Sequence, residues 1–117
     1  MLAQIIRMKI PNAERALIDI RKLRDYCLDS EHDEGKYKAR LFSAAFNMQA
    51  QHANELREIL LQVVQSSDAV LGRRDGYGQR YVIDFMMEWR GKRAMVRSGW
   101  IIEHDSDTPR LTTCYPL

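Results

Sequence analysis

Cysteine is scarce in this chain of 117 residues: it holds two, Cys27 and Cys114, far apart in the sequence. No CxxC pair is present, and neither His52 nor His104 has a partner at metal-ligand spacing. These absences argue against a disulfide framework and against a metal centre. We therefore predict reduced thiols, no metal and no cofactor, in a protein of the cytoplasm.

Several catalytic signatures are missing as well. The chain has no P-loop, no GxSxG, no HExxH and no paired carboxylates. Metal-free phosphodiester chemistry stays open, because cleaving RNA through its own 2′-hydroxyl needs only a base, an acid and cations. Residues 1–10 are interrupted by Arg7 and Lys9, so they resemble neither a signal peptide nor a membrane span.

The composition is that of an ordinary soluble domain, with 45% hydrophobic and 29% charged residues. We expect a single domain over residues 1–117 with its own core. The net charge of +2 permits a polyanionic partner without requiring one.

The last third of the chain predicts three β-strands, because its side chains alternate between two unlike faces. In the first strand the buried face takes Tyr81, Ile83, Phe85, Met87 and Trp89, and the open face takes Arg80, Val82, Asp84, Met86 and Glu88. A tight turn at Arg90 and Gly91 pairs positions whose numbers sum to 181. Asp84 then faces Arg97 across the hairpin, which supports this register.

The third strand follows Pro109. Simple alternation groups Leu111, Thr113 and Tyr115 on one face and Arg110, Thr112 and Cys114 on the other. The open face of the sheet then collects Arg80, Asp84, Arg97, Arg110 and Thr112, a positive surface that suits phosphate. An apolar group, Val82, Met86, Met95 and Ile101, shares that face and suits an oligomer or partner interface instead.

The first two thirds of the chain predict a short strand over residues 4–10 and three helices. Asp19 is the expected N-cap of a helix to about residue 28, a second helix begins near Lys36, and a third spans about residues 51–65. A strand over residues 68–73 follows. The expected fold class is α+β, with N-terminal helices packed on one face of a curved antiparallel sheet of about four strands.

Two residues outside the sheet are candidates for chemistry. Lys38 heads a buried stripe of Leu41, Phe42 and Ala45, so its ammonium either snorkels to the domain edge or points into a cleft. His32 precedes the same helix in a polar loop, where a solvated or backbone-bonded histidine and a catalytic one are both open.

The motifs resemble a family of small uncharacterised bacterial domains, which occur alone or at the C-terminal ends of polymorphic-toxin or phage proteins. The motifs are His-x-x-Gly-x-x-Lys-Ala-x-x-Phe from His32, Gly-Tyr-Gly-x-Arg-Tyr from Gly76, Val-Arg-Ser-x-Trp from Val96 and Pro-Arg-Leu-x-Thr-x-Tyr from Pro109. The match runs from about Pro11 to the C-terminus. One departure is Asp33, where the family usually has proline.

The layout is also similar to the nuclease superfamily that includes barnase, EndoU, colicin and RelE-like nucleases. That resemblance implies a metal-independent endoribonuclease toxin of a bacterial toxin-antitoxin or conflict system. In that hypothesis His32 is the acid or base, and Lys38 and Arg97 hold the scissile phosphate. The residues that bind RNA around them are Arg80, Arg40, Thr112 and Tyr115.

The alternative is a non-catalytic interaction module, whose open sheet face binds a small cognate protein or a second copy of the chain. Neither hypothesis involves a membrane.

Overall fold

A computed structural model describes residues 5–117 of the chain. The strands are β1 (Arg7–Met8), β2 (Ala69–Arg74), β3 (Gly78–Trp89), β4 (Lys92–Glu103) and β5 (Arg110–Pro116). The helices are η1 (Ala13–Arg15), α1 (Ile20–Lys22), η2 (Leu23–Cys27), α2 (Lys36–Phe46), η3 (Ala50–His52) and α3 (Ala53–Ser66). The expected α+β class is confirmed. The first residue of the strand expected over 4–10 lies outside the described residues.

All five strands form one antiparallel sheet in chain order, β1 to β5, so the sheet has one strand more than the four expected. The hairpin of β3 and β4 keeps the predicted register, with Asp84 opposite Arg97 and Phe85 opposite Val96. Its turn is Arg90 and Gly91, both with positive φ, as a two-residue hairpin turn of the I′ kind requires.

Strand β5 departs from simple alternation, and the expected grouping of its side chains is wrong. A β-bulge near Gly99 shifts the register, so Leu111 and Cys114 are both buried. An extra residue in one strand reverses the facing of every residue after it. Tyr115 consequently pairs with Arg97 on the face away from the core, where the sequence pattern had grouped it with Leu111.

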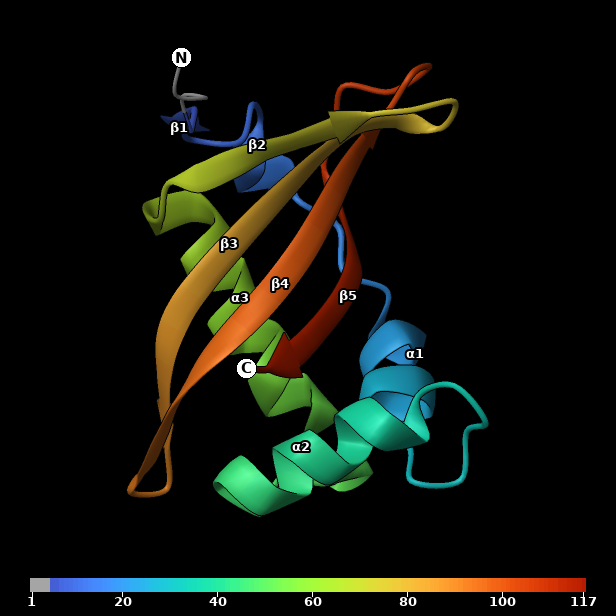
Figure 1. The fold of residues 1–117 in the computed structure, drawn as a ribbon, viewed down its shortest axis with the longest axis vertical. Coiled ribbons are helices and arrows are strands. Elements are labelled where there is room, and N and C mark those ends of the chain that lie inside the picture. The colour runs from blue at the N-terminus through green and yellow to red at the C-terminus, as the bar shows by residue number, and fades with distance from the viewer. Residues whose placement is uncertain (1–4) are drawn as a thin grey trace.

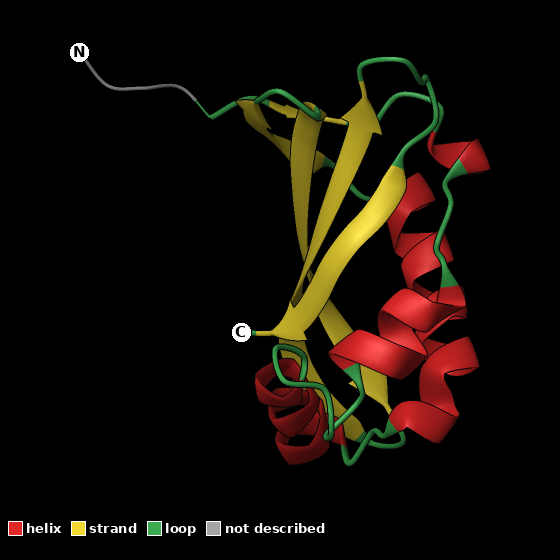
Figure 2. Ribbon diagram, turned by 90° about the vertical axis from the view of Figure 1, so that its right-hand side faces the viewer, coloured by secondary structure: helices red, strands yellow, loops and turns green. Residues whose placement is uncertain are grey.

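The helices form where the sequence predicts them. Asp19 caps α1 by accepting a hydrogen bond from the backbone N–H of Arg21, and the helix continues as the π-turn η2. Asn47 ends α2 in the left-handed conformation. α1 and α3 lie on one side of the sheet, and α2 lies across one end, next to the C-terminal end of β5 (Figures 1 and 2).

The core lies between the sheet and the helices. Trp100, Phe42, Leu56 and Ile83 are among its fully buried side chains. The expected exposure of Ile101 is wrong: only 1% of this residue is exposed, although it does not join the main core cluster. Its cross-strand neighbours are Arg80 and Arg110.

Candidate functional site

Tyr26, in η2, is the centre of the candidate site. Its hydroxyl accepts a hydrogen bond from the ammonium of Lys38, which also lies 4.4 Å from the centre of the tyrosine ring. The ring of His32 meets the same tyrosine edge-on, at 5.0 Å between ring centres. A Cβ at Gly35 would overlap the carbonyl oxygen of Tyr26, so only glycine allows this close approach. The motif His-x-x-Gly-x-x-Lys therefore surrounds one tyrosine.

His32 is tied to the start of α2. Its Nδ1 accepts hydrogen bonds from the backbone N–H groups of Glu34, at 3.0 Å, and Gly35, at 2.9 Å. An Nδ1 that accepts leaves the ring proton of a neutral imidazole on Nε2. His32 in this arrangement is bound to the backbone of the turn just before α2 and carries its ring proton on Nε2, which fits a backbone-bonded histidine better than a proton acceptor.

Lys38 also connects this group to the sheet. Its ammonium lies 5.9 Å from the centre of the Tyr115 ring, and Tyr115 pairs with Arg97 across β4 and β5. Lys38 thus points inward to two tyrosines instead of snorkelling away. Three predicted residues, Lys38, Arg97 and Tyr115, are brought together, and His32 joins them through Tyr26. We refer to Tyr26, His32, Lys38, Arg97 and Tyr115 as the Lys38 cluster.

Arg97 is held by a bidentate ion pair. Its Nε and Nη2 each donate to a carboxylate oxygen of Asp84 at 2.8 Å. These hydrogen bonds raise the pKa of the Arg97 guanidinium, with a smaller contribution from Tyr115. Arginine has five N–H donors, so the pair leaves Nη1 for another acceptor. Because Asp84 balances one of the two cations, the Lys38 cluster keeps a net positive charge.

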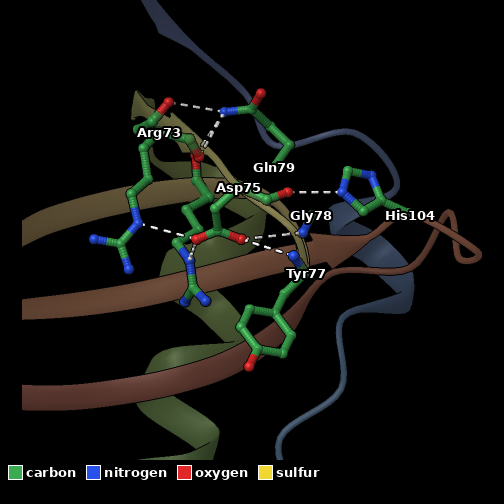
Figure 3. Close-up of polar contacts among 8 residues, drawn as sticks. Arg73, Asp75, Tyr77, Gly78, Gln79 and His104 are labelled. Atoms are coloured by element: carbon green, nitrogen blue, oxygen red, sulfur yellow. Dashed lines mark hydrogen bonds and ion pairs between the residues drawn. The ribbon is translucent and has the colours of Figure 1, made fainter.

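Arg80 lies elsewhere. Its Nε donates to Asp75 at 2.7 Å, and in the β3 strand it is four residues, about 13 Å, from Asp84. Asp75 also accepts from Arg73 and from the backbone N–H groups of Tyr77 and Gly78, while His104 contacts its carbonyl oxygen at 2.7 Å (Figure 3). These donors, above all Arg80, hold the pKa of Asp75 well below its usual range. The structure gives Arg80 a contact within its own turn and separates it from the Lys38 cluster.

The other predicted residues are dispersed. Arg40 lies on the exposed side of α2, with its guanidinium 5.6 Å from the centre of the Tyr37 ring. Thr112 lies at the β5 bulge, beside Gly99. Arg110 donates to Glu103 at 2.8 Å.

Tyr26 is the residue that the sequence analysis missed. Positions 32, 35 and 38 recur every three residues, a spacing that would place them on one side of a helix, although only Lys38 lies within α2 and the other two precede it. The partner on that side belongs to another helix, and the spacing does not reveal it.

The two cysteines lie next to the Lys38 cluster but do not share its chemistry. Both are buried, and the thiol of Cys27 lies against the backbone of Cys114. Burial raises the pKa of Cys27 to about 11 and that of Cys114 well above its usual value. Each thiol is therefore protonated at neutral pH, and a protonated thiol is a poor nucleophile.

These observations define an α+β domain with an open antiparallel sheet and a cationic, tyrosine-rich site at the β5 edge. The chain belongs to the family described as domain of unknown function DUF6883, which matches residues 9–117. No curated protein and no solved structure matches the chain. Over residues 5–117, no helix has both the length and the apolar character needed to cross a membrane.

Proposed function

We propose that this protein is a metal-independent endoribonuclease that acts as a toxin in a bacterial toxin-antitoxin or conflict system. The observation that carries the proposal is the convergence of Lys38, Arg97 and Tyr115 with Tyr26 at one edge of the sheet. The cluster supplies two cations for a phosphodiester and hydroxyl groups that can exchange protons.

In the proposed reaction the 2′-oxygen of RNA forms a bond to the adjacent phosphorus, and the bond from phosphorus to the 5′-oxygen breaks. Lys38 and the free Nη1 of Arg97 stabilise the charge that develops on the phosphoryl oxygens. Tyr26 gives its proton to the leaving 5′-oxygen and afterwards regains one from the ammonium of Lys38, which in turn takes a proton from solvent. The 2′-proton passes to solvent. His32 orients Tyr26 through the edge-on contact of the two rings, a narrower role than the acid or base that the motif suggested.

The direct test is to incubate the purified chain with RNA in EDTA. We expect cleavage that leaves a 2′,3′-cyclic phosphate, because in-line attack by the 2′-hydroxyl is the chemistry these groups permit. DNA of the same sequence, which lacks this nucleophile, serves as the control. Complete inactivity on RNA would contradict the proposal.

A second candidate function is a protein-interaction module. Met86 and Met95 face each other across β3 and β4, and 51% and 38% of them are exposed. Adjacent exposed methionines on a sheet face suit a second copy of the chain or a small protein partner. Ile101 no longer belongs to this patch, because it is buried.

A further inference from the structure

A second group of cations lies beside the Lys38 cluster. A cavity of about 520 Å³ opens between the segment that precedes α1, the helix α3 and strand β5. Three basic residues line it, Lys22, Arg57 and Arg110, against one carboxylate, that of Asp19. Arg21 engages this carboxylate in an ion pair of 2.7 Å, so the cavity keeps a positive charge.

One of the basic residues that line the cavity, Arg57, has a polar atom without a hydrogen-bond partner in the part of the chain that the structure describes. Its Nε is buried and has no hydrogen-bond partner within residues 5–117. A buried N–H group without an acceptor is unfavourable, so the described residues do not themselves satisfy this guanidinium fully, and Arg57 lines the cavity in which a ligand oxygen can approach its side chain. Arg110 uses only its Nε on Glu103, which leaves its two terminal nitrogens free to donate to the same ligand.

Lys22 links this cavity to the Lys38 cluster. It lines the cavity and also a shallower neighbouring hollow that contains Tyr26 and His32. Its ammonium lies 5.5 Å from the centre of the Tyr26 ring, and Lys38 lies 4.4 Å from the same ring. Cations therefore follow one another from β5 across α1 to the site proposed for the scissile phosphate.

We propose that the cavity lined by Lys22, Arg57 and Arg110 is a subsite for a second, non-scissile phosphate of the RNA chain. This inference rests on the proposed endoribonuclease function. Guanidinium groups bind phosphate oxygens through paired N–H donors, and a chain of successive phosphates fits a row of separated cations better than a single small anion does.

The test uses a labelled 2′-deoxy octanucleotide, which cannot be cleaved through a 2′-hydroxyl, and follows its binding by fluorescence anisotropy. We expect Arg57→Gln to raise Kd about tenfold, as the loss of a charge-assisted hydrogen bond does. The slope of log affinity against log salt should fall in magnitude by about 0.7, the value for one phosphate contact on a single strand. Arg93→Gln, at the distant hairpin end of β4, should change neither quantity.

A second variant is needed as a control, because Arg57 belongs to α3, a helix that packs on the core, and its substitution could weaken binding by destabilising the fold. Lys22→Gln should weaken binding of the same oligonucleotide, and thermal melting should show both variants folded. Binding by both folded variants that equals the wild type would overturn the subsite, as would a wild type that does not bind the oligonucleotide. The endoribonuclease proposal can be contradicted independently of the subsite. A wild-type protein that binds the oligonucleotide through Arg57 but does not cleave RNA would support the subsite and contradict the endoribonuclease.

Discussion

Lys38 is the residue on which the proposed chemistry depends most. Its ammonium contacts Tyr26 and Tyr115 and forms no ion pair with a carboxylate within residues 5–117. Arg97, in contrast, is bound to Asp84. The uncompensated cation of the Lys38 cluster is therefore the lysine, and a phosphate would interact with it most strongly.

Replacing Tyr26 by phenylalanine tests the role of its hydroxyl alone. Tyr26→Phe keeps the ring that contacts His32 but removes the oxygen to which Lys38 donates. We expect RNA cleavage to slow by about 10²-fold or more, the lower end of what a general acid contributes. Tyr37→Phe, which removes an exposed hydroxyl from α2, is the matched control. An unchanged rate for Tyr26→Phe would exclude its hydroxyl from the reaction.

At the scale of elements, the junction of η2 with α2 positions the Lys38 cluster. Gly35 packs against the backbone of Tyr26, while His32 accepts from the first N–H groups before the helix. The same contacts that begin α2 therefore place Lys38 beside Tyr26.

Gly35→Ala should disturb this junction. The added methyl would overlap the Tyr26 carbonyl, and overpacking of this kind costs about 1 to 3 kcal/mol of unfolding free energy. Gly76→Ala is the control, because a Cβ there meets no atom within 4 Å. Chemical denaturation measures both, and equal stability of the two variants would contradict the close packing at Gly35.

The turn between β2 and β3 contains Asp75, which should make the free energy of unfolding depend on pH in the acidic range. The pKa of Asp75 is lowered in the folded protein, so its contribution is fully present above the unfolded value of about 3.9 and is lost as the pH falls below it. Asp75→Asn should therefore show a smaller loss of stability between pH 7 and pH 3 than the wild type in urea denaturation. Asp105→Asn, in an exposed loop, is the control. Identical pH dependence in wild type and Asp75→Asn would contradict this assignment.

The sequence predicts the elements well, because each signal is local. Asp19 as a cap, the stripe of α3 and the charge pair of Asp84 with Arg97 all depend on residues close in the chain or related by one hairpin turn. The β5 bulge is different, because it arises from packing between two strands that a longer loop connects. Tyr115 therefore lies on the face opposite to the one that simple alternation predicts. The contact between Tyr26 and Lys38 could not be predicted either, because it also depends on the packing of separate elements, η2 and α2.

At the scale of the whole molecule, the helices leave one face of the sheet open (Figure 2). That face carries the ion pair of Asp84 with Arg97 and the methionines Met86 and Met95. The Lys38 cluster lies at its β5 edge, so an RNA and a protein partner would approach the same side of the domain. A partner bound there would restrict access to the Lys38 cluster.

The methionine patch makes a prediction about association. If it forms an interface, Met86→Glu should convert a dimer into monomers, because a buried carboxylate without a partner is strongly unfavourable. Size-exclusion chromatography with light scattering measures this. Glu88→Gln, an exposed position two residues along the same strand face, is the control. A wild-type protein that is monomeric, and with which no partner is isolated from its host, would contradict the interaction module.

The most direct measurement compares Lys38→Gln with Lys36→Gln in single-turnover cleavage of RNA in EDTA. Both lysines belong to the first turn of α2, but Lys36 contacts Tyr37 and Lys38 contacts Tyr26 and Tyr115. We predict that Lys38→Gln lowers the rate by about 10²-fold or more while its thermal unfolding stays close to that of the wild type, and that Lys36→Gln cleaves normally. Equal cleavage by the wild type and both variants would contradict a catalytic site at Lys38.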